Sequence, residues 1–267
     1  MLPMKVSLFV TCLTDIFAPD VGMAVVKSLE YFGCTVDFPT AQTCCGQPAF
    51  NNGFPDEART LARRMIQVFE NSDYIVTPSG SCCAMIRDHY IHLMEGDALW
   101  EQKATEFVAR TYEYVEFLTK ILKVDLRGLS LPTEKKFTYH FTCHLRGLDT
   151  TGEPCINLLS QIGNTRFTPL EKAEQCCGFG GTFAIKYSDI SRAMVMDKLS
   201  CGNKTGADEM IVNDAGCAMN IGGACHRHGG KFVPRHIAQV IAQAIDNNRE
   251  SAPRHAAEPT IATGEKK

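Results

Sequence analysis

The sequence TCCGQPA at residues 43–49 is matched later in the chain by QCCGFGG at residues 175–181. Each stretch contains two adjacent cysteines followed by a glycine. The surrounding cysteines match as well: 31 and 32 residues separate the triplets from Cys12 and Cys143, and 35 and 38 residues separate them from Cys82 and Cys217. The sequence therefore predicts an internal duplication, whose offset is far too long for a solenoid repeat.

The segments around these cysteines extend the duplication. KVSLFVTC (5–12) resembles KFTYHFTC (136–143), and YIVTPSGSC (74–82) resembles MIVNDAGC (210–217). We therefore expect two similar lobes, at residues 1–123 and 137–246, joined by the segment 123–136, which contains Pro132. Residues 249–267 lose all periodicity, and we expect them to form a disordered tail.

Segments typical of strands and helices alternate in both lobes. Strands are expected at 5–12, 35–39, 74–79, 137–143 and 209–213. Helices are expected at 20–32, 55–71, 81–95, 106–122, 154–162, 188–199 and 234–247. This alternation predicts an α/β fold in which each lobe is a small, largely parallel sheet flanked by helices.

Composition and charge exclude several classes of protein function. The chain has 267 residues, of which 45% are hydrophobic, so it can form a substantial core. Its net charge of −3 gives no electrostatic basis for binding nucleic acid. No apolar run approaches the roughly 20 residues of a membrane span, and the first residues read as a strand rather than a signal peptide. These features predict a cytoplasmic protein without a transmembrane segment.

Thirteen cysteines are many for such a protein. Thiols stay reduced in the cytoplasm, so metal binding or redox chemistry explains them better than a disulfide scaffold. Four cysteines of each lobe recur at matching positions, mostly just after predicted strands, where parallel sheets bind ligands. The candidate ligands are Cys12, Cys44, Cys45 and Cys82 in the first lobe, and Cys143, Cys176, Cys177 and Cys217 in the second.

Four thiolates match the ligand set of an iron–sulfur cluster or of a structural zinc ion. Neither lobe has the C-x₂-C pair that structural zinc prefers, which favours the cluster. Two alternatives stay open at this point: zinc in one or both lobes, and a metal-free dithiol redox site. The glycine after each cysteine pair is expected to adopt a positive φ angle, which lets backbone amides approach the sulfur atoms.

The duplicated pattern resembles the cysteine-rich (CCG) domain, which also occurs twice in the cysteine-rich subunit of heterodisulfide reductase and in the glycolate oxidase iron–sulfur subunit. With SGSCCAMI (79–86) and QCCGFGGTFAIKYSDIS (175–191), the chain is similar to the lactate utilisation protein A family over residues 4–246. The resemblance implies an electron-transfer subunit of a cytoplasmic L-lactate (2-hydroxy acid) oxidation complex. It also implies one or two 4Fe-4S clusters held by the eight cysteines, and two partners: a ferredoxin-like iron–sulfur subunit and a third small subunit.

The sequence departs from the heterodisulfide reductase pattern at two positions. In that enzyme, the last cysteine of each motif belongs to a C-x-x-C, whereas Met85 and Asn220 stand here. A four-thiolate cluster is therefore the expectation, with Cys83 as a fifth thiolate in the first lobe only. A zinc-stabilised assembly module and a heterodisulfide-type thiol–disulfide reductase subunit are the alternative functions.

Other residues receive mostly structural interpretations. Cys34, Cys155 and Cys201 lack counterparts and are expected to be buried apolar residues. Cys225, in the segment GGACHRHGGK (222–231), is placed in a basic surface loop. His144 is a candidate hydrogen-bond partner of a cluster sulfur. No acid–base role is assigned to Asp214 or Asp189, no catalytic residue is identified, and no flavin or nicotinamide motif is present.

Overall fold

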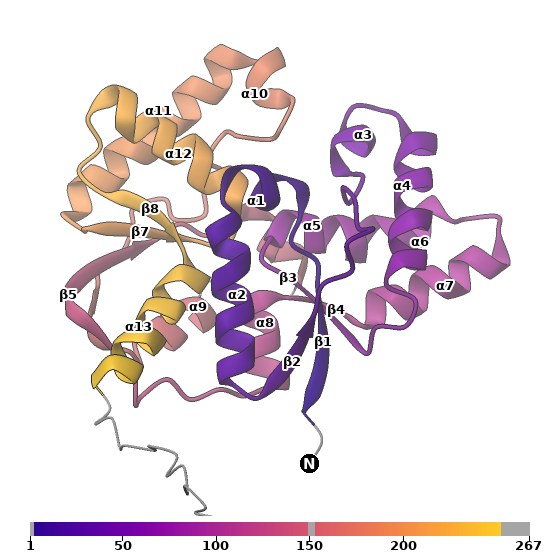
Figure 1. Ribbon diagram of the computed structural model, residues 1–267. Coiled ribbons are helices and arrows are strands. Elements are labelled where there is room, and N and C mark those ends of the chain that lie inside the picture. Colours follow the sequence, from indigo (N-terminus) through magenta and orange to yellow (C-terminus); the bar gives the residue numbers. More distant parts are fainter. Residues whose placement is uncertain (1–2, 149–152, 252–267) are drawn as a thin grey trace, which may run out of the picture.

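The computed structural model describes residues 3–148 and 153–251, which contain two four-stranded parallel sheets flanked by helices (Figure 1). The first sheet has the order β2-β1-β3-β4, and the second has the equivalent order β6-β5-β7-β8. The strands are β1 (Met4–Leu8), β2 (Cys34–Asp37), β3 (Tyr74–Thr77), β4 (Thr111–Glu113), β5 (Ser130–Tyr139), β6 (Gly163–Phe167), β7 (Glu209–Val212) and β8 (Val233–His236). This architecture confirms the predicted α/β fold with two similar lobes.

Helices connect the strands in both lobes. The first lobe contains α1 (Cys12–Phe17), α2 (Pro19–Tyr31), α3 (Gln47–Asn51), α4 (Pro55–Val68), α5 (Gly80–Ala84), α6 (Tyr90–Leu93), α7 (Ala98–Ala109) and α8 (Tyr114–Glu116), with π-helical turns at Met85–His89 and Phe117–Ile121. The second contains the 3₁₀ helix η3 (Cys143–Leu148), α9 (Glu153–Leu159), α10 (Phe183–Lys186), α11 (Ser188–Thr205), α12 (Ala215–His228) and α13 (Ile237–Ser251).

The sequence predicted the edge strand β2 but not the edge strands β4, β6 and β8. The segment 106–122, expected as one helix, is interrupted by β4, which pairs in parallel with β3. The helix expected at 234–247 starts only at Ile237, because the preceding residues form β8 on the edge of the second sheet. Both strands have three or four residues, too few to show a period, and their pairing partners are distant in the sequence.

The boundaries also differ at the linker and the tail. Strand β5 begins at Ser130, so the second half of the expected linker belongs to the second sheet. Helix α13 continues to Ser251, and the rest of the predicted tail, residues 252–267, lies outside the described residues.

The two lobes interlock through equivalent elements. Helix α13 packs along α2, helix α1 contacts α12, and helix α5 contacts η3. One continuous apolar cluster contains buried side chains of both lobes, including Leu29 of α2 and Ile241 of α13. Because α5 and α12 occupy matching places, as do α1 and η3, the lobes are related by an approximate twofold arrangement that brings the carboxyl ends of both sheets together.

Buried polar residues at the strand ends also join the lobes. Glu113 ends β4 and accepts a hydrogen bond from Asn213 of the second lobe (3.1 Å). Its other carboxylate oxygen accepts the backbone N–H groups of Val115 (2.7 Å) and Glu116 (3.0 Å), so it caps α8. His236 occupies the matching position in β8, and its Nε2 donates to the carbonyl oxygen of Pro78 (3.1 Å).

The buried carboxyl group of Glu113 is expected to make the unfolding free energy of the chain depend on pH. Burial raises its pKa from an ordinary value of 4.5 to about 7, so the folded chain retains a proton that the unfolded chain releases above pH 4.5. Its contribution to stability is therefore complete below pH 4.5 and is lost as the pH rises through 7, by about 3 kcal/mol. Between pH 4.5 and 8, we expect the unfolding free energy of the wild type to fall by this amount relative to that of Glu113→Gln. Denaturant unfolding at several pH values measures it, and a constant difference would contradict the raised pKa.

Candidate functional site

The structure brings the four predicted cysteines of the first lobe together. Cys12 is the first residue of α1, Cys82 lies in the first turn of α5, and Cys44 and Cys45 lie in the loop before α3. The Sγ atoms of Cys12 and Cys44 are 3.7 Å apart, and those of Cys45 and Cys82 are 3.3 Å apart. We call these four residues the first cysteine set.

The second lobe repeats this arrangement. Cys143 begins η3, Cys217 lies in the first turn of α12, and Cys176 and Cys177 lie in the loop after β6. The Sγ atoms of Cys177 and Cys217 are 3.3 Å apart, and the thiol of Cys143 hydrogen-bonds to Cys176. These four residues form the second cysteine set.

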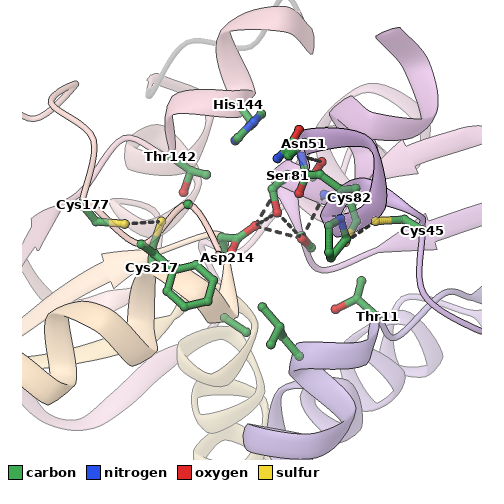
Figure 2. A pocket seen from close by; sticks show the side chains of 18 of the residues that line it. Thr11, Cys45, Asn51, Ser81, Cys82, Thr142, His144, Cys177, Asp214 and Cys217 are labelled. Atoms are coloured by element: carbon green, nitrogen blue, oxygen red, sulfur yellow. Dashed lines mark hydrogen bonds between the residues drawn. The ribbon is translucent and has the colours of Figure 1, made fainter. Parts of the chain in front are cut away.

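All eight cysteines line one cavity of about 440 Å³ between the lobes (Figure 2). In each sheet, the strand order changes direction between the first strand and its neighbour, at β1 and β3 in one lobe and at β5 and β7 in the other. Cysteines follow both strands at each of these switch points. Parallel sheets bind ligands at this place. The interlocked lobes turn the two switch points toward a common space.

The glycine of each triplet shapes the cysteine loops. Gly46 and Gly178 have φ angles of 87° and 85°, which confirms the expected conformation. A Cβ atom at Gly178 would lie 2.7 Å from the carbonyl oxygen of Ser191, and one at Gly46 would lie 3.2 Å from that of Ala58. Both sites therefore require glycine for its backbone conformation and for its small size.

Each set stabilises one thiolate. Hydrogen bonds from neighbouring thiols lower the pKa of Cys44 to about 3 and that of Cys176 to about 2. The donors are Cys12 and Cys45 in the first set, and Cys143 and Cys177 in the second. The backbone N–H of Gly178 also lies 3.4 Å from the sulfur of Cys176. Thiolates are the form of cysteine that binds metals.

Asp214 separates the two sets and was not assigned a role from sequence (Figure 2). It is the N-cap of α12, where one carboxylate oxygen accepts the N–H of Gly216 (3.0 Å). The other oxygen crosses to the first lobe and accepts both hydroxyls, Ser79 (2.9 Å) and Ser81 (2.6 Å), and the N–H of Ser81 (3.1 Å). Ser79 is itself the N-cap of α5, so one carboxylate connects the helix starts that carry Cys82 and Cys217. The matching positions of Ser79 and Asp214 before these cysteines were the available signal.

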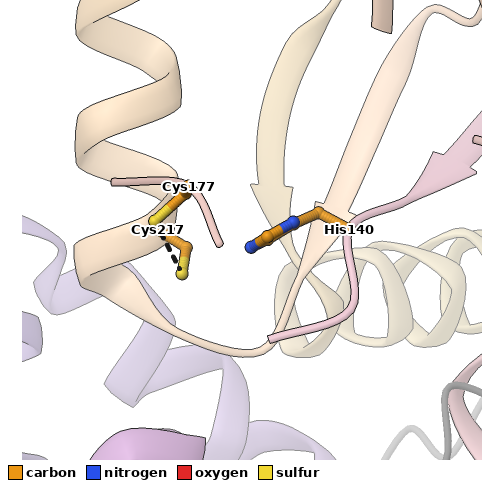
Figure 3. A group of neighbouring side chains, drawn as sticks. All are labelled: His140, Cys177 and Cys217. Atoms are coloured by element: carbon orange, nitrogen blue, oxygen red, sulfur yellow. Dashed lines mark hydrogen bonds between the residues drawn. The ribbon is translucent and has the colours of Figure 1, made fainter. Parts of the chain in front are cut away.

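His140 is the second residue that sequence reasoning missed. Its buried ring faces Cys177 and Cys217 (Figure 3), and one ring nitrogen and the two sulfur atoms lie within 4.8 Å of one another. Burial lowers the pKa of His140 to about 3, so the ring is neutral at neutral pH. Phe9 stands at the matching position of the first lobe, and this polar exception in otherwise similar segments was a readable signal.

The remaining candidates lie outside the two sets. Cys34, Cys155 and Cys201 are buried, as predicted. Cys83 is also fully buried, in the core cluster that includes Tyr114, and does not line the cavity. The segment around Cys225, expected as a loop, is helical to His228 because α12 continues to that residue. His144 is exposed at the cavity, with its Nδ1 3.6 Å from the sulfur of Cys143.

The donor chemistry of both sets fits a metal centre. Four sulfur donors per set match the ligands of an iron–sulfur cluster or of a zinc ion. The adjoining cavity provides space for the inorganic part of a cluster. Among the helices of residues 3–148 and 153–251, none combines the length and apolar character that crossing a membrane requires.

Comparison with known proteins agrees with the duplication. The model of the cysteine-rich domain family, CCG, matches residues 6–87 and again residues 137–222. A solved structure of a hypothetical protein from Helicobacter pylori has a similar fold, with a TM-score of 0.65 and 10% identity, over 91% of this chain and 49% of that one.

Relatives from several bacilli are much more similar in sequence. Proteins named lactate utilization protein A from Bacillus licheniformis and from Bacillus subtilis (strain 168) are each 45% identical to this chain, and one from Geobacillus thermodenitrificans is 47% identical. Each alignment covers 89% of this chain and 98 to 99% of the relative. The chain therefore belongs to the cysteine-rich (CCG) domain family and to the lactate utilization protein A family.

Proposed function

We propose that this chain is an iron–sulfur electron-transfer subunit of an L-lactate (2-hydroxy acid) oxidation system. The observation that carries the proposal is the convergence of two four-cysteine sets on one cavity. The names of the relatives supply the link to lactate utilisation. A cytoplasmic location is part of the proposal, because thiols stay reduced in that compartment.

The eight cysteines would hold two clusters, for which the resemblance indicates the 4Fe-4S type. A bound cluster supplies one-electron chemistry, whose potential depends on ligands, hydrogen bonds to sulfur and solvent exposure. The chain's own contribution is to hold four of the cysteines at helix starts and the other four in loops, and to connect the helix starts that carry Cys82 and Cys217 through Asp214.

The described residues offer no flavin or nicotinamide motif, so a partner would remove the electrons from the hydroxy acid. We propose a ferredoxin-like iron–sulfur subunit and a third small subunit as partners. The cavity opens beside Ile185, which is 81% exposed and precedes the exposed Tyr187 and Ile190. This apolar rim would allow a partner to approach the centres closely.

Growth on lactate tests the cellular role. We expect deletion of the gene for this chain to abolish growth on lactate as the sole carbon source, and expression of the wild-type chain to restore it. Cys44→Ser and Cys176→Ser are expected to fail to restore growth, because each removes a ligand. Cys201→Ser, a buried cysteine outside both sets, serves as the control. Full growth with both ligand variants would contradict the proposal.

A second candidate is a zinc-stabilised assembly module. The observation that favours it is the short separation of the sulfur atoms, 3.3 to 3.7 Å. A tetrahedral zinc ion with bonds of about 2.3 Å places its thiolates roughly 3.8 Å apart. Stoichiometric zinc without sulfide, in colourless protein prepared without oxygen, would select this candidate. A thiol–disulfide reductase is the third alternative, and counting thiols before and after mild oxidation of metal-free protein distinguishes it.

A further inference from the structure

We propose that His140 is a nitrogen ligand of the metal centre in the second cysteine set, so that the two centres of this chain are chemically different. This inference rests on the proposed function in one respect, which is that the second set binds a metal centre. It concerns a residue outside the eight cysteines and gives the second set a donor that the first set lacks.

The position of His140 supports a ligand role. The side chain follows β5, the same strand that leads to Cys143, and it is fully buried. One edge of the ring points at Cys177 and Cys217 (Figure 3), and the three potential ligand atoms lie within 4.8 Å of one another. Neutral imidazole nitrogen and thiolate sulfur together form familiar ligand sets for zinc and for iron.

The ring is otherwise unexplained. Neither Nδ1 nor Nε2 of His140 has a hydrogen bond in the structure. Leaving a buried polar group unpaired destabilises a protein by about 1–3 kcal/mol, so such groups are rare and require a reason. The carbonyl oxygen of Ala173 lies near enough to influence the ring, although the contact falls short of hydrogen-bond geometry. Metal-bound histidines commonly donate their second N–H to a backbone carbonyl of this kind.

The matching position in the first lobe shows that an apolar ring can fill the place of His140. Phe9 occupies the place of His140 and is fully buried against Phe69, with ring centroids 6.1 Å apart. An apolar ring therefore satisfies the fold at this position. The buried polar ring in the second lobe has a different purpose, and its orientation toward two sulfur atoms identifies that purpose as metal binding.

A buried cation strengthens the asymmetry. Lys198 of α11 is almost fully buried, and its Nζ donates to the carbonyl oxygens of Lys172 (2.6 Å) and Ala173 (3.2 Å). Its charge interacts with Cys177 and Cys217. The positive charge of Lys198 is expected to raise the potential of a nearby iron–sulfur centre, and a neutral imidazole adds a ligand without adding negative charge. We therefore expect the second centre to accept electrons from the first.

Pulsed EPR on protein labelled with ¹⁵N-histidine tests the ligand directly. The full chain, prepared without oxygen and reduced with dithionite, is expected to show one strongly coupled histidine nitrogen. His140→Phe, which copies the first lobe, should lose this coupling and change the potential of one centre only. His226→Phe, which removes an exposed histidine of α12 that does not line the cavity, is the matched control and should retain both. If the chain holds zinc, X-ray absorption at the zinc edge replaces EPR, with nitrogen expected at about 2.0–2.1 Å.

The outcomes separate the two proposals. A metal centre with sulfur ligands only, or a nitrogen signal that persists in His140→Phe, would overturn the role of His140 and leave the electron-transfer function standing. Absence of any metal centre from the wild-type chain would overturn both. The wild-type measurement is decisive by itself, so the test does not depend on the folding of the variant.

Discussion

Cys176→Ser is expected to remove the metal centre of the second cysteine set and to leave the first set loaded. Hydrogen bonds from Cys143 and Cys177 make Cys176 the acidic thiol of its set, whereas a serine hydroxyl does not ionise near neutral pH. Cys44→Ser removes the corresponding thiolate of the first set. Each single variant should lose about half of the iron and acid-labile sulfide per chain, and the double variant nearly all of it.

The control for these variants is Cys201→Ser. Cys201 lies in α11 of the second lobe, is 3% exposed and does not line the cavity. It should keep the full metal content, with circular dichroism confirming that all variants are folded. The assignment of the sets would be wrong if Cys44→Ser and Cys176→Ser both retained full metal content, or if Cys201→Ser lost as much as they do.

Asp214→Ala is expected to lower the unfolding free energy by about 3–5 kcal/mol, the largest stability effect of a single cavity residue. The buried carboxylate accepts four hydrogen bonds, from Gly216, Ser79 and twice from Ser81. Removing it leaves buried donors unpaired, deletes the N-cap of α12 and separates the lobes where the two sets meet. Because Cys82 and Cys217 both follow this contact, we also expect faster loss of metal from both sets.

The variant Asp214→Asn separates the capping of α12 from the hydrogen bonds that the carboxylate accepts across the lobes. Its amide oxygen can still cap α12, but the amide nitrogen cannot accept the N–H of Ser81, so the loss should be intermediate. Asp189→Ala is the matched control, since Asp189 is an exposed acid in the first turn of α11. Denaturant unfolding of the three variants measures the effect. A change below about 1 kcal/mol for Asp214→Ala would contradict the bridging role.

The duplication and the fold class could be predicted from the sequence because both depend on local sequence patterns. The repeated CCG triplets and matching flanks predicted the duplication, and the alternating segments predicted the α/β class. Edge strands β4 and β8 were missed because three or four residues carry no period, and pairing with β3 and β7 determines their conformation.

The candidate site also depends on contacts between distant residues, which the sequence does not reveal. Spacing grouped the cysteines into two sets of four, but only the interlocked lobes place both sets on one cavity. Asp214 and His140 lie in no recognisable metal or catalytic motif, and only the comparison of matching segments in the two lobes distinguishes them. Their roles depend on contacts with residues far away in the chain, such as Ser79 for Asp214 and Cys177 for His140.

The central claim is that both cysteine sets hold iron–sulfur clusters. The most direct test is to determine iron, acid-labile sulfide and zinc per chain on protein purified without oxygen, with visible spectra before and after dithionite. Two 4Fe-4S clusters would give iron and sulfide near eight each per chain, and a brown colour that bleaches on reduction. Stoichiometric zinc without sulfide, or protein without any metal, would contradict it.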